Sequence, residues 1–160
     1  MNKLFTLSLL LSSLLIANEM VTTELPATHI KNIEVNQTTY FSYDEALELA
    51  RKNHKIIMIK LTAQHCHFCK KMDREVMVEK EVVTALKKDF VSVEIDVDND
   101  KIPLDLNPTM TPTFIFVTED EKIMAKIPGS WGKEDFLDFL KSAVEKSKEE
   151  KSKKEKGEAL

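Results

Sequence analysis

A chain of 160 residues is long enough for one domain with a substantial hydrophobic core, but too short for two domains of ordinary size. It is 42% hydrophobic and 31% charged with a formal net charge of −4, and no basic patch with interleaved aromatic residues points to nucleic acid. With only three glycines, it contains no phosphate-binding loop, no dinucleotide fingerprint, no HExxH and no GxSxG, which excludes those enzyme classes.

Residues 1–17 have the pattern of a secretory signal peptide. Lys3 is the basic start, Leu4–Ile16 is the apolar run, and Ala17 is the expected last residue before cleavage. An uncleaved N-terminal anchor stays open as the alternative, because Leu15 is large for a position near a cleavage site. In both cases we expect an exported domain that works in the periplasm, and we favour the cleaved form.

Residues 18–40 are predicted to be a linker, in which the weak alternation of Ile30–Val35 indicates a short edge strand. The folded domain is predicted over residues 41–145. It begins with a helix that Ser42 and Glu45 start as a capping box. The charged end, residues 146–160, alternates lysine and glutamate and is predicted to be a frayed helix extension or a disordered tail.

After the first helix, the hydrophobic pattern predicts strands separated by helices and then a hairpin. The expected elements are a strand over 55–61, a helix ending near 77, a helix over 80–88, a strand over 90–97, a short helix around 103–106, hairpin strands over 113–117 and 122–127, and a helix over 133–148. This order predicts an α/β fold with a mixed central sheet that carries helices on both faces.

The only two cysteines, Cys66 and Cys69, lie at the junction between the strand that contains Ile56–Ile59 and the helix that follows. A strand, a tight turn and a helix place Cys66 at a helix N-terminus, where free N–H groups and the helix dipole favour a thiolate. Cys69 is one turn further on the same face, within reach of a disulfide. We therefore predict dithiol–disulfide exchange, with Cys66 as an exposed nucleophile and Cys69 as the resolving thiol.

Two other roles for this cysteine pair stay open. Cys66 and Cys69 with His65 or His67 have the ligand types for Cu(I) or zinc, although a structural zinc site usually needs four ligands and there is no second cysteine pair. An inert structural disulfide is the other alternative, but a ring this short restrains little chain entropy.

Two motifs resemble the thioredoxin superfamily, and most closely its exported thioredoxin-like members. The first is the strand Lys55–Ala63 followed by the CxxCKxM motif of Cys66–Met72, and the second is Met110–Phe116. The resemblance extends over about two thirds of the chain, from Ser42 to Leu140, and implies a thioredoxin-like three-layer fold.

The resemblance also implies that the bond between Thr111 and Pro112 is cis and that its loop faces the cysteines. A cis X-Pro bond is a minority state that the fold must enforce. Its loop would present the Thr111 backbone to an extended client chain, so Thr111 and Pro112 are candidate substrate-binding residues.

The sequence departs from thioredoxins proper around the cysteines. His65 replaces a tryptophan, and His67 and Phe68 stand between the cysteines. Either histidine can donate a hydrogen bond to the thiolate or place positive charge beside it. We interpret Phe68 as an apolar tip that contacts substrate, and Trp131 as a packing residue or a rim of the client groove.

A second departure concerns the position six residues before the first cysteine, where the family has a buried acid and this chain has Lys60. Glu94 stands on the neighbouring strand, where the family usually has a lysine. Our hypothesis is a charge-swapped ion pair of Lys60 and Glu94 beneath the cysteines, in which the cation favours the thiolate and Glu94 accepts a proton from Cys69. The alternative is that Lys60 extends to solvent and Glu94 is a surface residue.

Together these features predict a periplasmic thiol–disulfide oxidoreductase whose clients are proteins with thiols or disulfides. We expect a monomer that uses no cofactor and no metal, exchanges electrons with a redox partner in the membrane, and binds no nucleic acid. Both directions of electron flow stay open. A Cu or Zn metallochaperone and a non-enzymatic chaperone or adaptor are the competing functions.

Overall fold

The structure is a computed structural model that describes residues 37–158. The expected signal peptide, most of the expected linker and the strand expected over Ile30–Val35 lie outside the described residues. All that follows concerns the described part of the chain.

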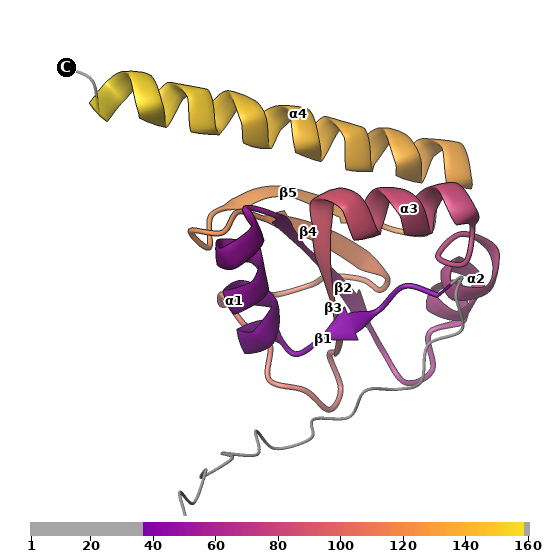
Figure 1. The fold of residues 1–160 in the computed structure, drawn as a ribbon. Coiled ribbons are helices and arrows are strands. Elements are labelled where there is room, and N and C mark those ends of the chain that lie inside the picture. Colours follow the sequence, from indigo (N-terminus) through magenta and orange to yellow (C-terminus); the bar gives the residue numbers. More distant parts are fainter. Residues whose placement is uncertain (1–36, 159–160) are drawn as a thin grey trace, which may run out of the picture. The chain divides into compact units, whose positions relative to one another are not determined.

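The domain is a five-stranded sheet with four helices (Figure 1). The strand order is β1-β3-β2-β4-β5, in which β1, β3 and β2 are parallel, β4 is antiparallel to β2, and β5 is antiparallel to β4. The elements are β1 Tyr40–Phe41, α1 Tyr43–Asn53, β2 Ile56–Thr62, α2 His67–Glu75, α3 Lys80–Asp89, β3 Phe90–Asp96, β4 Thr113–Val117, β5 Ile123–Pro128 and α4 Lys133–Glu158. The predicted mixed α/β sheet is confirmed.

Helix α1 begins where its sequence predicts. The Ser42 side chain accepts a hydrogen bond from the Glu45 backbone, and the Glu45 carboxylate accepts one from the Ser42 backbone N–H at 3.1 Å. This reciprocal capping box satisfies N–H groups that have no partner inside the helix. The helix stops at His54, which adopts the left-handed conformation with φ 54°.

The central strand β2 separates two hydrophobic cores, because its side chains alternate between the two faces of the sheet. Ile57, Ile59 and Leu61 pack against α1 on one face. Ile56 and Met58 face the other core, which α2, α3 and α4 cover. Figure 1 shows α3 and α4 side by side along this second face. Lys60 continues the second series, so the alternation directs its side chain toward the face that carries α2.

The short helix predicted around 103–106 is wrong. The structure has a turn there, in which Leu104 and Asp105 have φ values of 57° and 49°. Left-handed residues cannot continue a right-handed helix. Leu106 instead returns to the core beside α1 with 5% exposure.

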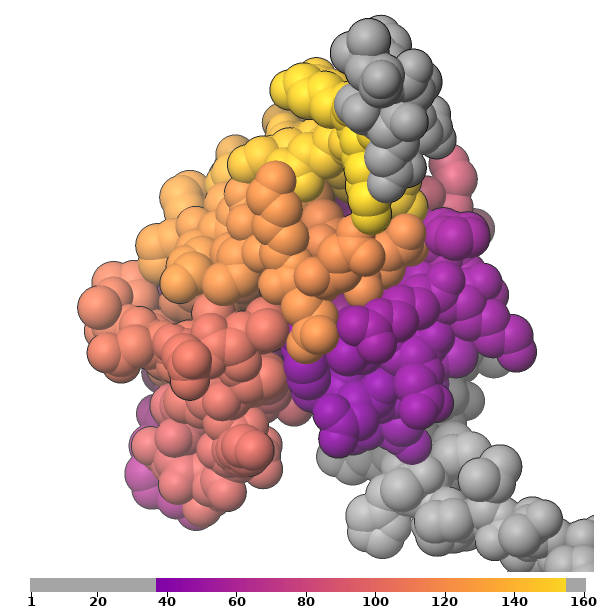
Figure 2. Space-filling view, turned by 90° about the vertical axis from the view of Figure 1, so that its left-hand side faces the viewer, coloured from indigo at the N-terminus to yellow at the C-terminus, as the bar shows by residue number. Residues whose placement is uncertain are grey.

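Helix α4 continues to Glu158 through the lysine- and glutamate-rich segment, so the part of this segment that the structure describes is a helix extension. Three side chains of α4 pair with residues of the β4–β5 hairpin turn: Glu150 with Lys122 at 2.9 Å, Lys151 with Glu119 at 3.5 Å, and Lys154 with Asp120 at 3.3 Å. Figure 2 shows the yellow end of α4 next to the orange hairpin and the indigo α1. No helix within residues 37–158 combines the length and apolar character that crossing a bilayer requires.

The second core depends on Phe136, which is fully buried with its ring 4.7 Å from that of Phe114. We expect Phe136→Ala to lower the free energy of unfolding by about 3–5 kcal/mol, because it leaves a large cavity. Phe68→Ala makes the same chemical change at an exposed position and should change it by less than about 0.5 kcal/mol. Urea denaturation followed by circular dichroism measures both, and equal effects would contradict this assignment of the core.

Candidate active site

The two cysteines form a disulfide at the start of α2. Their Cα atoms are 5.2 Å apart. Cys66 is the N-cap of the helix, and its Sγ accepts a hydrogen bond from the Cys69 backbone N–H at 3.0 Å. This N–H and the helix dipole favour negative charge on the same sulfur in the reduced protein. The placement of Cys66 at a helix N-terminus therefore agrees with the sequence prediction.

The expectation of an exposed nucleophile needs correction. Cys66 is only 9% exposed and Cys69 only 2%, because the helix turn and its surroundings cover most of the disulfide. A client sulfur can approach Cys66 only along the small surface that stays open, and Cys69 lies behind it. The difference in access suits an attacking role for Cys66 and a resolving role for Cys69.

The loop that contains Pro112 lies next to the cysteine segment. The Thr111–Pro112 peptide bond is cis. In the antiparallel register Leu61 pairs with Thr113. Pro112, the residue before Thr113, therefore lies beside the end of β2 from which the chain continues to Cys66. The Pro112 carbonyl accepts a hydrogen bond from Gly129 N–H at 2.8 Å, and the Met110 carbonyl accepts one from the Thr113 hydroxyl at 2.8 Å. These bonds fix the loop at both ends.

Three large apolar side chains near the start of α2 and the proline loop are exposed. Phe68 is 58% exposed, Met110 is 53% exposed and Trp131 is 37% exposed. Trp131 also packs, with its ring 5.0 Å from that of Phe139 and its backbone N–H 3.2 Å from the Met72 sulfur. Trp131 therefore packs against the domain and also leaves an edge exposed, which combines both predicted roles. The exposure of Met110 beside the proline loop was not predicted from the sequence.

The histidines beside the cysteines are exposed. The His67 ring lies edge-on to the Phe68 ring, with centroids 5.5 Å apart. Within residues 37–158 no hydrogen bond joins His65 or His67 to either cysteine of the disulfide. Their predicted support of the thiolate thus stays a prediction about the reduced protein.

Lys60 is fully buried under α2, so the alternative in which it reaches solvent is wrong, although Glu94, with a side chain that is 38% exposed, does lie at the surface. The Lys60 Nζ donates to Glu94 Oε2 at 2.6 Å, as the hypothesis of a charge-swapped pair requires, and Lys60 and Glu94 are register partners on β2 and β3. A second carboxylate, that of Asp73 on α2, bonds the same ammonium. Asp73 was missed, although its position four residues after Cys69 places it on the same helix face.

Tyr40 of β1 closes this charged cluster from the edge of the sheet. The Lys60 Nζ lies 5.7 Å from the centre of the Tyr40 ring, within range of a cation–π contact. The Tyr40 hydroxyl is buried and has no hydrogen-bond partner among the described residues. Burial, and then the charges of Glu94 and Asp73, raise the pKa of Tyr40 well above its usual range, so the phenol stays neutral.

Asp98 holds the loop that precedes the cysteines. Its carboxylate accepts a hydrogen bond from the Gln64 backbone N–H at 3.0 Å. The next residue toward β3, Val97, donates its N–H to the Thr62 carbonyl at 2.9 Å. The turn after β3 therefore fixes the backbone between β2 and Cys66, a role that the sequence did not indicate.

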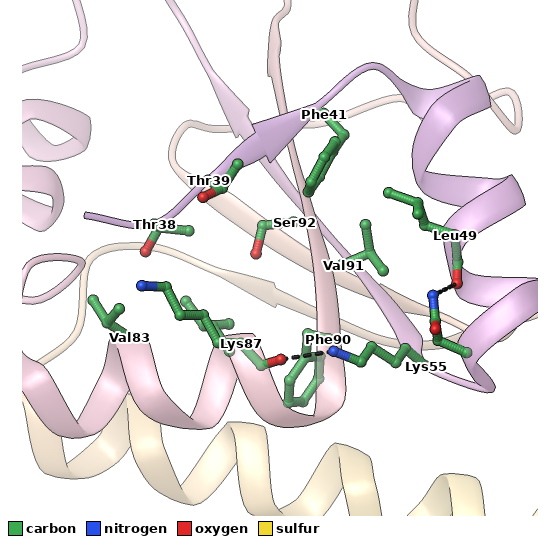
Figure 3. A pocket seen from close by; sticks show the side chains of 12 residues that line it. Thr38, Thr39, Phe41, Leu49, Lys55, Val83, Lys87, Phe90, Val91 and Ser92 are labelled. Atoms are coloured by element: carbon green, nitrogen blue, oxygen red, sulfur yellow. Dashed lines mark hydrogen bonds between the residues drawn. The ribbon is translucent and has the colours of Figure 1, made fainter. Parts of the chain in front are cut away.

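A hollow of about 270 Å³ lies elsewhere, beside β1 at the edge of the sheet. Figure 3 shows Thr38, Thr39 and Ser92 toward one end of it and Leu49 and Val91 toward the other. No residue of the cysteine motif or of the proline loop lines it. A reaction at the disulfide therefore takes place outside this hollow.

A CxxC disulfide at a helix N-terminus, in a mixed sheet with a helix-covered face on each side, defines a thioredoxin-like protein and is consistent with a thiol–disulfide oxidoreductase. A sequence model of the thioredoxin-like domain matches residues 43–143, more than half of the chain. The chain therefore belongs to the thioredoxin-like domain family.

Solved structures with the same fold include a thioredoxin from Thermus thermophilus, with a TM-score of 0.59 and 24% identity over 70% of this chain and 90% of that one. A putative disulphide-isomerase from Bacteroides thetaiotaomicron has a TM-score of 0.60 and 19% identity, over 71% and 98% of the two chains. The protein described as DsbH Oxidoreductase has a TM-score of 0.57 and 20% identity, over 74% and 94%. At these identities the likeness establishes the fold.

One curated relative is the human Spermatogenesis-associated protein 20, which is 38% identical over 52 residues. The matched segment is 32% of this chain and only 7% of that protein. The likeness is therefore limited to a short segment.

The buried Tyr40 hydroxyl leads to a prediction about stability and pH. At neutral pH, Tyr40→Phe should leave the free energy of unfolding unchanged or raise it by up to about 1 kcal/mol, because a buried hydroxyl without a partner is removed. Folding raises the pKa of Tyr40, so the unfolded chain loses its phenol proton first and stability falls as the pH rises above about 10. The variant should lose less stability there, and urea denaturation across alkaline pH measures this.

Tyr43→Phe is the matched control. The Tyr43 hydroxyl donates to Glu121 Oε1 at 3.1 Å, so the same substitution removes a hydrogen bond and should cost about 0.5–1.5 kcal/mol at neutral pH. A loss of stability in Tyr40→Phe as large as that in Tyr43→Phe would contradict the assignment of the Tyr40 hydroxyl.

Proposed function

We propose that this protein is a thiol–disulfide oxidoreductase that exchanges disulfides with client proteins through Cys66 and Cys69. The observation that carries the proposal is the Cys66–Cys69 disulfide at the N-terminus of α2, with the cis Thr111–Pro112 bond in the neighbouring loop. A reversible disulfide needs one sulfur that a client can reach and one partner within bonding reach. Cys66 keeps 9% of its surface open, more than the 2% of Cys69, and the two sulfurs are bonded to each other.

In the reducing direction, the Cys66 thiolate attacks one sulfur of a client disulfide. A bond forms between Cys66 and that sulfur, and the other client sulfur leaves as a thiolate that takes up a proton. Cys69 then loses its proton and attacks Cys66, which re-forms the internal disulfide and releases the second client thiol. Two electrons pass from the cysteine pair to the client, and the reverse sequence donates a disulfide to a reduced client.

The client chain would bind beside Cys66 in an extended conformation. Thr111 offers backbone groups next to the cis bond, and the exposed side chains of Phe68, Met110 and Trp131 offer apolar contacts for a partly unfolded client. Main-chain hydrogen bonds give affinity that is independent of sequence, while side-chain contacts select among clients. This arrangement suits protein clients better than small thiols.

We further propose that the protein acts after export, as a monomer, with a membrane protein as its redox partner. The support is the signal-like pattern of residues 1–17, because a cysteine pair outside the cytosol needs a partner to restore its oxidation state. Cell fractionation and the N-terminal mass of the mature protein test export and cleavage. An intact Met1 in a cytosolic fraction would contradict this part of the proposal.

Two single substitutions test the exchange mechanism. Cys66→Ser should abolish disulfide exchange in an insulin-reduction assay, because the attacking sulfur is lost. Cys69→Ser should keep the attack but trap clients as mixed disulfides, visible as mass-shifted bands that dithiothreitol removes. Equal trapping by both variants would refute the assigned roles, and activity that persists in Cys66→Ser would favour a chaperone or adaptor.

The competing metal-binding function uses the same sulfurs in their reduced state. Cys66, Cys69 and either His65 or His67 have the donor types for Cu(I) or zinc, whereas the structure has the two sulfurs joined to each other. Titration of the reduced protein with Cu(I) and Zn(II) beside the insulin assay separates the two functions. Tight stoichiometric metal binding without exchange would replace the oxidoreductase proposal.

A further inference from the structure

The charges under the active-site helix do not balance. One ammonium, that of Lys60, bonds two carboxylates, those of Asp73 and Glu94. The neighbouring phenol of Tyr40 is neutral. The cluster therefore carries one negative charge in excess. The ammonium is fully buried, whereas the side chains of Asp73 and Glu94 are 46% and 38% exposed, so solvent screens part of this charge.

Cys69 is the cysteine that lies nearest to this cluster along α2. Asp73 follows it by four residues in the same helix, which brings their Cβ atoms to about 5–6 Å on one helix face. Cys69 is also the more deeply buried cysteine. A thiolate on Cys69 would therefore place negative charge in the interior beside a cluster that is already negative, and both burial and like charge disfavour that state.

Cys66 experiences the opposite influence. Its sulfur accepts the Cys69 N–H at the helix N-terminus, and Asp73 is two turns away along the axis. The other titratable groups near the pair are His65 and His67 at the start of the helix, Lys70 on its exposed side, and Asp98, whose carboxylate accepts the Gln64 N–H; all four residues are exposed. The negative cluster consequently lies on the Cys69 side of the pair.

We propose that Asp73, which shares Lys60 with Glu94, is a positioning residue that keeps Cys69 a thiol and thereby sets the pH at which the resolving step occurs. The inference rests on the proposed exchange function and adds a residue to it. In the resolving step the Cys69 proton leaves to water, Cys69 forms its bond to Cys66, and the client sulfur departs with the electron pair of the broken bond. The carboxylates of Asp73 and Glu94 oppose the loss of the Cys69 proton.

The test begins with the titration of Cys69 alone. In the full-length Cys66→Ser protein, the ultraviolet absorbance of the thiolate reports the ionisation of Cys69 as the pH rises. Asp73→Asn in this background makes the cluster neutral, with Lys60 still paired to Glu94. The titration midpoint should then fall by about half to one pH unit, a three- to tenfold rise in thiolate at a given pH below the midpoint.

Three further variants make the comparison specific. Asp73→Glu keeps the charge and should restore a midpoint close to that of the parent. Glu75→Gln removes a carboxylate from an exposed position of the same helix, where it pairs with Arg74, and should leave the midpoint unchanged. Glu94→Gln makes the cluster neutral from the other side and should shift the midpoint in the same direction as Asp73→Asn. Circular dichroism establishes that each variant is folded.

The second readout is the resolving step itself, in protein with both cysteines. Stopped-flow mixing of the reduced protein with excess glutathione disulfide separates the attack by Cys66, which depends on disulfide concentration, from the resolution by Cys69, which does not. In Asp73→Asn the pH profile of the resolving rate should move to lower pH, while the attack rate changes by less than about twofold. A purely structural role of Asp73 would slow both steps without moving the profile.

Each outcome has a defined meaning. An unchanged or raised midpoint in Asp73→Asn, or an equal shift in Glu75→Gln, overturns the inference while leaving disulfide exchange intact. A shift in Asp73→Asn without one in Glu94→Gln overturns the sharing of Lys60. If the native protein exchanges no disulfides at all, the proposed function and the role in resolution fail together.

Discussion

The burial of the Lys60 ammonium is the constraint on which the arrangement of the site depends. An ammonium in the interior of a protein loses several kcal/mol of hydration, and only close, well-placed anions compensate for this loss. Lys60 stands on the central strand, so its partners must come from the neighbouring strand and from the helix above. Glu94 of β3 and Asp73 of α2 meet this need. The same bonds hold α2, and with it the disulfide, in a defined position over the sheet.

A second constraint is the register of the sheet, which assembles the site from segments far apart in sequence. The pairing of Leu61 with Thr113 brings the end of β2, which leads to the cysteines, beside the start of β4, which follows the cis bond. The turn after β3 adds Asp98, which holds the backbone of Gln64. Three loops thus converge at one end of the sheet, where the disulfide keeps only a small opening to solvent.

The sequence predicted those features whose causes are local. The capping box of Ser42 and Glu45 and the strand and helix around the cysteines depend on neighbours within a few residues. The contact between Lys60 and Glu94, which are 34 residues apart, was predicted from the resemblance to thioredoxins together with strand alternation. The other contacts between distant segments were missed, because no local pattern specifies them. In the sequence, Asp73 is one of many charged residues on a helix. The left-handed turn at Leu104 and Asp105 contains no glycine that would have predicted it. The helix extension is held by partners in the β4–β5 hairpin, which is distant in the sequence.

Two electrostatic influences act in opposite directions on two sulfurs that are only three residues apart. The helix N-terminus favours charge on Cys66, whereas the partly exposed carboxylates of Asp73 and Glu94 oppose charge on Cys69. If the two thiols had the same pKa, either sulfur could ionise and attack a client, but the helix would block an attack from Cys69, the more deeply buried of the two. The separation of the two acidities therefore matches the separation in access: the sulfur that a client reaches is also the one that ionises first. In this view the lysine on the central strand concentrates two carboxylates on one side of the disulfide, and this asymmetry gives the exchange reaction its order.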